Sequence, residues 1–355
     1  REKFLFAAKQ ADAECQSFEH PFARTASNAV LTLDTAWLGP RDAKHVMVMI
    51  SGTHGPESYA GAAIQLNWLK THTAFPSSSM AMLLIHGANP FGWAHYSRTT
   101  ENNVDLNRNF IDHDQPPSEA PLAHRVQTLL SLSDTKGPRY TAILLGLVRL
   151  LLGVGMKQVV NAISNGQYSH PKGIGFGGSC AEWSNQVVQT LLNDSLKQAE
   201  QVAIIDWHTG VGDYAKPCFL CFDALDSASY QRARRWWGEE VDKSHASYAS
   251  GERPDYQGLL INAARDIAQA TGAKTTSSVI EFGTYANHKM LKGLIIDRWL
   301  RCGADDASAE TIADLKEQVL RLFYPNDPDW RAQVLEQGAD IISQALAGLN
   351  SEQAD

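Results

Sequence analysis

Near-continuous apolar runs that alternate with amphipathic segments are the feature that most constrains the fold of this chain. Residues 45–51 (HVMVMIS), 80–85 (MAMLLI) and 202–207 (VAIIDW) consist mostly of apolar side chains. Such runs are typical of strands whose sheet has both faces covered by helices. Their alternation with helical segments therefore predicts an α/β fold.

The same pattern places the other elements. Further strands are expected at residues 30–33, 217–222 and 276–282, where apolar side chains gather between turn residues. Helices are expected at residues 58–71, 120–131, 140–164, 181–199, 229–245, 258–271, 289–301 and 327–349. A chain of 355 residues can bury the core of one large α/β domain, or of two ordinary ones, without disulfide or metal support.

The charge balance argues against nucleic acid and membrane partners. With 31 Lys and Arg against 39 Asp and Glu, the formal net charge is −8. Nucleic acids and anionic membranes both favour a basic surface, so neither is expected as a partner. The longest apolar stretch, residues 141–156, contains Arg149 and is shorter than the ~20 residues that a membrane-spanning helix needs.

The five cysteines do not form the pattern of a secreted disulfide scaffold, because they are odd in number and scattered along the chain. Cys218 and Cys221 are three residues apart in a predicted strand, so their side chains would face opposite sides of the sheet. We therefore interpret both as buried apolar side chains and not as a redox or zinc pair. With no targeting segment visible in residues 1–10, this cysteine usage favours a reducing, cytoplasmic location.

The segment at about residues 111–200 is long for a connection between two strands. It contains predicted helices and a glycine-rich stretch at residues 173–178 (GIGFGG). This stretch matches G-x-G-x-x-G but follows no predicted strand, so a dinucleotide site is not expected. We interpret the segment as a helical and glycine-rich insertion, either a subdomain or a lid, within one catalytic domain that spans residues 1–355.

Two histidines and a glutamate are expected at one edge of the sheet. His54 and Glu57 lie in S-G-T-H-G-P-E, directly after the strand at 45–51, and His208 follows the strand at 202–207. Ligand sites of open α/β sheets form at the carboxyl ends of strands. Each residue alone is more often an ordinary turn or capping side chain. Together, two histidines and one carboxylate are the three-ligand set of catalytic zinc, whose fourth position is left to water.

Polar residues gather after two other predicted strands. Asn, Asp and Arg side chains, including Arg98, fill the segment 89–110 after the strand at 80–85. A turn-rich surface loop would have the same composition. Arginine is also the side chain that pairs with carboxylates and stabilises a developing oxyanion. Glu281 ends the strand at 276–282, where a carboxylate beside a metal can accept and return a proton.

Taken in order, these motifs resemble those of the zinc carboxypeptidase family. They are H-x-x-E (54–57), N-P-x-G (89–92), an arginine, D-x-N-R (105–108), a second histidine and a late glutamate. The match is closest to a bacterial branch of that family, and G-T-H-G-P-E and D-x-H also resemble the succinylglutamate desuccinylase and aspartoacylase branch. The motifs cover most of the chain. The resemblance implies a three-layer α/β/α sandwich with a mixed central sheet.

The resemblance also implies catalytic roles. His54, Glu57 and His208 would bind one Zn²⁺ per chain. Glu281 would be the general base and acid, and Arg98 would polarise the scissile carbonyl and stabilise its oxyanion. Arg98 lies closer to the following Asn-Arg pair than in the digestive enzymes of the family, so its role is less firmly implied than those of the ligands.

The residues that hold the substrate are implied in the same way. Asn107 and Arg108 would bind a substrate carboxylate, and Asp105 would orient His54, since metal-bound imidazoles usually have such a partner. The family's mobile active-site tyrosine has no clear counterpart. Tyr256 lies at a suitable distance along the chain, although a tyrosine of the core or surface would fit there equally well.

The resemblance therefore predicts a zinc-dependent metallohydrolase that cleaves an amide bond with a metal-activated water, above all a metallocarboxypeptidase-like peptidase. A deacylase of N-acyl amino acids is the alternative, and an insertion that narrows the pocket would favour small substrates. A metal- or peptide-binding protein without turnover is the third interpretation. The expected partner is a small peptide or an N-acyl amino acid, and the sequence does not decide the oligomeric state.

Overall fold

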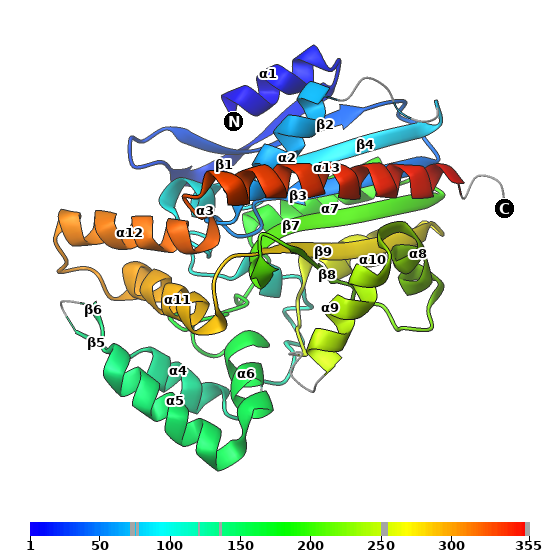
Figure 1. Cartoon of the computed structure of the whole chain (residues 1–355). Coiled ribbons are helices and arrows are strands. Elements are labelled where there is room, and N and C mark those ends of the chain that lie inside the picture. The colour runs from blue at the N-terminus through cyan, green and yellow to red at the C-terminus, as the bar shows by residue number, and fades with distance from the viewer. Residues whose placement is uncertain (72–74, 76–77, 120, 135–136, 250–254, 352–355) are drawn as a thin grey trace.

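A mixed sheet of seven strands runs through the centre of the molecule (Figure 1). The computed structural model describes residues 1–71, 75, 78–119, 121–134, 137–249 and 255–351. The strands are β1 (Glu14–Arg24), β2 (Val30–Leu38), β3 (His45–Ser51), β4 (Met80–His86), β7 (Gln201–Tyr214), β8 (Pro217–Leu220) and β9 (Lys274–Gly283). Their order is β1-β2-β4-β3-β7-β9-β8. β4, β3, β7 and β9 are mutually parallel, whereas the pairs β1–β2, β2–β4 and β8–β9 are antiparallel.

Helices cover both faces of the sheet, which confirms the expected three-layer α/β/α sandwich (Figure 1). One face is covered by α1 (Glu2–Gln10), α2 (Ser58–Thr71), α8 (Ala228–Trp237), α9 (Glu239–Ala249) and α13 (Pro328–Ser351). The other face is covered by α7 (Trp183–Ser195) and α10 (Leu260–Ala270). Buried apolar side chains fill both interfaces, including Trp207 and Trp330 on the first and Val188 and Ile204 on the second. The burial of this apolar surface is the main favourable contribution to folding.

The part of the expected insertion at residues 123–164 packs against itself and α11 (Asn287–Cys302), away from the sheet, whereas the last helix of the insertion, α7, covers the sheet (Figure 1). It contains α4 (Ala123–Leu130), β5 (Ser133–Asp134), β6 (Gly137–Pro138), α5 (Tyr140–Val154) and α6 (Met156–Ser164). Their apolar side chains form a separate cluster with Ile295 of α11. α12 (Ala309–Phe323) packs on α11 through Val319 and Phe323. Among the described helices, none combines the length and apolar character needed to cross a membrane.

The predicted strands are present, whereas two predicted helices are each divided in two. The helix expected at 140–164 is interrupted at Gly155, whose φ is +87°. The helix expected at 229–245 is interrupted at Gly238, whose φ is +74°. Glycine adopts positive φ without the steric cost that other residues incur, and such a residue ends a helix. The first residue of the helix expected at 120–131 lies outside the described residues.

The structure also contains elements that the sequence pattern did not indicate. β1 pairs with β2 at the edge of the sheet, and its segment contains Pro21 and charged side chains, which edge strands tolerate. α12 begins after Ser308, whose hydroxyl accepts a hydrogen bond from the backbone N–H of Thr311. α3 (Pro90–His95) begins with proline and is capped by the side chain of Asn89.

Candidate metal centre

The candidate ligands lie where the order of the strands reverses. β3 is followed along the chain by α2 and by β4 on one side, whereas β7 lies on the other side of β3. Ligand sites of open α/β sheets form at the carboxyl ends of strands at such a switch point. His54 lies in the turn after β3. β7 does not end at Trp207 as expected but continues to Tyr214, so His208 lies within the strand and one residue past the end of β3.

Three ligand atoms converge at this point, one each from His54, Glu57 and His208, and lie within 4.8 Å of one another. Nδ1 of His54 is 3.0 Å from Oε1 of Glu57, and Nδ1 of His208 is 3.0 Å from Oε2 of the same carboxylate. The backbone N–H of Thr209 also donates to Oε2, at 3.1 Å. Each of the three side chains is only 2–3% exposed, so the cluster is held rigidly inside the protein.

A carboxylate holds the other nitrogen of each histidine ring. Nε2 of His54 donates to Asp105 Oδ1 at 3.0 Å, and Nε2 of His208 donates to Asp206 Oδ2 at 2.8 Å. The hydroxyl of Thr53 donates to the other oxygen of Asp206 at 2.9 Å. We assign the Nε2–H tautomer to both rings from these acceptors. This tautomer leaves both Nδ1 lone pairs directed into the cluster, as metal binding requires.

The electrostatic balance of the cluster favours a cation. Four carboxylates and one guanidinium surround the histidines: Glu57, Asp105, Asp206, Glu281 and Arg98. Burial opposes a charge on His208, yet the adjacent Asp206 and Glu57 raise its pKa well above the ordinary value. Burial likewise favours a neutral Glu57, yet the histidines beside it lower its pKa. Because Nδ1 and the carboxylate oxygens are acceptors only 3.0 Å apart, a proton or a metal ion is needed between them.

Arg98 links the carboxylates on both sides of His54. Its Nη1 lies 2.8 Å from Glu57 Oε1, and its Nε lies 3.3 Å from Asp105 Oδ2. The backbone N–H of Arg98 donates to Asp297 Oδ2 at 3.1 Å. The side chain is 19% exposed and borders a small cavity lined also by Asp297 and residues 173–175. Arg98 is thus fixed at its backbone and its guanidinium, and it is more accessible than the three ligand residues.

Glu281 lies on β9 in register with His208 on β7. Its side chain is buried, and Oε2 accepts a long hydrogen bond of 3.4 Å from the backbone N–H of Val211. Burial, together with the neighbouring Glu57 carboxylate, raises the pKa of Glu281 to about 8. A carboxyl group with a pKa near neutrality can both take up and release a proton at physiological pH.

The expected substrate-binding residues are engaged by the insertion and by α10. The side-chain oxygen Oδ1 of Asn107 accepts a hydrogen bond of 2.9 Å from the backbone N–H of Leu260. Arg108 is buried, and its Nε and Nη2 donate to the backbone oxygen of Ser164 at 3.1 and 2.7 Å. The ring centre of Tyr256 lies 4.9 Å from the guanidinium carbon of Arg108. Arg108 and Tyr256 are therefore neighbours, but Nε and Nη2 of Arg108 are directed at the end of α6, and Nη1 donates to the backbone oxygen of Asn107.

Two carboxylates of the site were not assigned a role from the sequence. Asp206 holds His208, and its spacing carried a signal, because residues two apart in a strand face the same side. Asp297 lies on α11 and binds the backbone of Arg98, which is 199 residues away along the chain. Nothing in the local sequence marks that contact, because it depends on where α11 packs.

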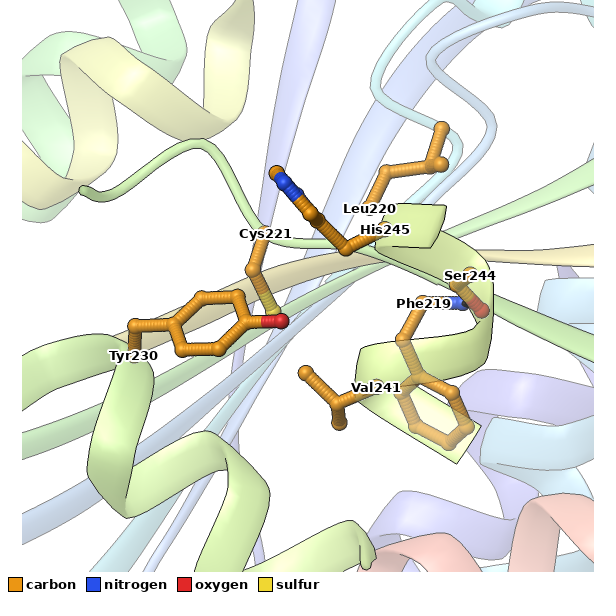
Figure 2. Close-up of a pocket in the computed structure, with 7 residues that line it drawn as sticks. All are labelled: Phe219, Leu220, Cys221, Tyr230, Val241, Ser244 and His245. Atoms are coloured by element: carbon orange, nitrogen blue, oxygen red, sulfur yellow. Dashed lines mark hydrogen bonds between the residues drawn. The ribbon is translucent and has the colours of Figure 1, made fainter. Parts of the chain in front are cut away.

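A second small pocket lies beside β8, away from these residues (Figure 2). Its lining is mostly apolar: Phe219, Leu220, Cys221, Tyr230, Val241, Ser244 and His245. Cys221 belongs to the core on one face of the sheet and Cys218 to the core on the other, as expected for buried apolar side chains. Among the described residues, the side chains that could together hold a metal ion gather at the histidine cluster and not at this pocket.

A family model described as "Protein of unknown function (DUF2817)" matches residues 1–337 of the chain. A search of curated proteins finds no match. Among solved structures, the chain is similar to carboxypeptidase A from Helicoverpa armigera, with 10% identity over 89% of this chain and 71% of that chain, at a TM-score of 0.43.

Two further solved structures are also similar to the chain. Bovine thrombin-activatable fibrinolysis inhibitor, in complex with tick carboxypeptidase inhibitor, is 12% identical over 90% of this chain and 94% of that chain, at a TM-score of 0.43. A succinylglutamate desuccinylase from Silicibacter sp. TM1040 is 12% identical over 87% of this chain and 65% of that chain, at a TM-score of 0.36. At these identities and scores, the similarities assign no activity to this chain.

Proposed function

The chain belongs to the DUF2817 family, and we propose that it is a zinc-dependent metallohydrolase that cleaves an amide bond, with metallocarboxypeptidase-like peptidase activity. One observation carries this proposal. The Nδ1 atoms of two histidines converge on one glutamate carboxylate, while a separate carboxylate holds each Nε2. Two histidines and a carboxylate are a ligand set of catalytic zinc, and carboxylates behind metal-binding imidazoles are their usual support.

His54, Glu57 and His208 would hold the zinc ion. They fit it because their converging atoms are all acceptors, and a cation satisfies them together. Bound zinc would supply a Lewis acid that polarises a carbonyl oxygen and lowers the pKa of water to about 7. In the part of the chain that the structure describes, these residues form the single cluster of three or more such ligands.

Glu281 would move the proton. Its carboxylate takes a proton from water as the water oxygen bonds to the amide carbon, and gives that proton to the nitrogen as the C–N bond breaks. Its register with His208, and the backbone N–H of Val211 that donates to its Oε2, support this role. Arg98 would stabilise the negative charge that develops on the carbonyl oxygen, because its guanidinium is a fixed donor beside the cluster.

The burial of the site favours a small substrate. Glu281 and the three proposed zinc ligands are all buried, which leaves little room for a folded protein chain. A short peptide whose terminal carboxylate meets Asn107, Arg108 and Tyr256 is the first candidate. An N-acyl amino acid is the second candidate, and the enclosed site supports it. A metal- or peptide-binding protein without turnover is the contrary outcome of the test below.

The test combines metal analysis with an assay on C-terminal peptides and on N-acetyl and N-succinyl amino acids. We expect about one zinc per chain, lost in His208→Ala. Glu281→Gln should keep the zinc and lower kcat by ~10²- to 10⁴-fold. The matched control Glu310→Gln, at an exposed position, should change neither the zinc content nor kcat. Absence of bound metal after zinc reconstitution would refute the proposal, and zinc binding with no turnover of any amide would favour the binding protein.

A further inference from the structure

We propose that His124 and His170 form a second metal site, on the surface of the insertion, that binds a divalent transition-metal ion such as Zn²⁺. His124 is exposed at the start of α4, and His170 is half-buried in the segment that follows α6. Nδ1 of His124 lies 3.2 Å from Nε2 of His170. The two residues are 46 positions apart, so only the folded insertion brings them together.

The separation of these nitrogens is that of two ligands on one ion. Zn–N bonds are about 2.0–2.1 Å long, and a tetrahedral angle between two of them places the nitrogens about 3.3–3.4 Å apart. The ring centres are 4.9 Å apart and the ring planes are inclined by 41°, so the rings meet through their nitrogens and not by stacking. Without metal, one ring N–H can donate to the other ring. When a metal ion binds, the donating ring takes its other tautomer, with the proton on the opposite ring nitrogen, and both facing lone pairs bind the ion.

The backbone on both sides of the pair is already held in place. His124 lies on the regular helix α4. The backbone N–H of His170 donates to Gln167 Oε1 at 2.7 Å, and its backbone oxygen accepts from Gln167 Nε2 at 2.8 Å. Glu119 accepts hydrogen bonds from the backbone N–H groups of Tyr168 and Ser169 at 2.6 and 2.7 Å. Such preorganisation lowers the entropy lost when the ion binds.

Two protein ligands make a weaker site than the buried cluster. The exposure of the pair leaves the other coordination positions to water, so a tightly held structural ion is not expected. Imidazole nitrogen suits copper, nickel and zinc, and affinity for a given site generally rises from Ni²⁺ to Cu²⁺. The pair should therefore bind Cu²⁺ more tightly than Ni²⁺, and it should fill with Zn²⁺ only after the buried cluster is occupied.

An ion at this pair would connect α4 to the segment that runs towards the buried cluster. Asn103 Nδ2 donates to the backbone oxygen of Pro171 at 2.8 Å. The backbone N–H of Asp105 donates to the backbone oxygen of Phe176 at 2.7 Å. Residues 173–175 line the cavity beside Arg98. Occupancy of the His124–His170 pair would therefore stabilise the wall of that cavity and raise Tm.

The experiment measures zinc uptake by the full chain after the buried cluster has been filled. Equilibrium dialysis against rising Zn²⁺, with elemental analysis, should show a second ion in the wild type. His124→Ala and His170→Ala should each weaken that second step by about tenfold or more, because one nitrogen alone loses the chelate. His288→Ala, at an exposed histidine on α11, is the matched control and should bind as the wild type does.

A second measurement reads the ligands directly. Cu²⁺ added to the zinc-loaded wild type should give an electron paramagnetic resonance spectrum with splitting from two nitrogens, which both single variants lose. Equal second-step affinity in wild type and variants, or uptake of no second ion by the wild type, would overturn the proposal. His208→Ala separates the two sites, since it should abolish the first step and leave the His124–His170 step unchanged.

Discussion

Replacement of Asp206 by asparagine should weaken zinc binding while the fold survives. Asp206 is fully buried, with one oxygen 2.8 Å from His208 Nε2 and the other bonded to the Thr53 hydroxyl. Asparagine has the same shape. Its oxygen can still accept from the imidazole, and the hydroxyl can turn to accept from its NH₂ group. Asp206→Asn thus removes the negative charge behind His208 and keeps the geometry.

The loss of the negative charge of Asp206 determines how much zinc affinity the variant loses. A carboxylate forms a hydrogen bond roughly twice as strong as that of a neutral acceptor, and it makes the imidazole a better donor to a metal. Loss of such outer partners costs about 10- to 100-fold in metal affinity. At about 1.4 kcal/mol per tenfold, this corresponds to about 1.4–2.8 kcal/mol.

The assay is competition for zinc with a chromogenic chelator at pH 7, on protein whose fold is checked by circular dichroism. Asp194→Asn is the matched control, because Asp194 is exposed and pairs with Lys197 on the surface. Wild-type zinc affinity in a folded Asp206→Asn variant would show that Asp206 does not support the ligand. An equal loss in both variants would show that the effect is not local to His208.

Three more changes test other parts of the site. Arg98→Lys keeps the charge but loses the planar fork that joins two carboxylates, and should lower kcat by about 10²-fold with zinc content unchanged. Burial raises the pKa of Asp297 from 3.8 to about 6, so its contribution to stability is present below pH 3.8 and is lost as pH rises through 6. In urea titrations of metal-free protein, the stability of Asp297→Asn relative to wild type should therefore rise by about 2.4 kcal/mol between pH 4 and pH 8. Gly258→Ala places a Cβ 2.2 Å from the backbone oxygen of Arg108 at φ +67°, and should lower the free energy of unfolding by more than about 1 kcal/mol.

Each of these changes has a result that contradicts its argument. Wild-type kcat in Arg98→Lys would remove the guanidinium fork from the mechanism. A stability difference between Asp297→Asn and wild type that does not change with pH would show that the buried carboxyl group does not titrate as stated. Unchanged urea midpoints in Gly258→Ala would show that the backbone there moves freely away from Arg108. Gly272→Ala is the control for the backbone conformation alone, since its φ is +87° but nothing lies within 4 Å of the added atom.

The parts of the fold that follow from the sequence are those with a strong local pattern. β3 has the predicted limits, because its apolar run at residues 46–50 is buried on both faces and is bounded by the polar residues His45 and Ser51. The break at Gly155 was missed because a glycine is tolerated inside a helix, and only its φ of +87° ends this one. The order of the strands has no local signal at all, since it depends on which strand pairs with which.

The candidate site could likewise be predicted only in part from the sequence. His54, Glu57 and His208 could be selected because each follows an apolar run that predicts a strand, and the structure brings all three together although β7 continues past His208. The roles of Glu281 and Arg98 stay predictions. The carboxylate-binding role of Arg108 also stays a prediction, and the structure adds a condition to it. Its donors reach the backbone oxygen of Ser164, so a substrate carboxylate would have to compete with the insertion for them.

α11 explains why the insertion and the candidate site should respond to each other. This helix follows the strand of Glu281, and on it Asp297 binds the backbone of Arg98. One residue further on, Arg298 donates to the backbone oxygen of Lys172 at 2.8 Å, within the insertion. Arg301 donates to the backbone oxygen of Glu101 at 2.8 Å, in the segment that carries Arg98. Because the same helix contacts the insertion and fixes Arg98, a shift of the insertion is expected to change the position of Arg98 as well.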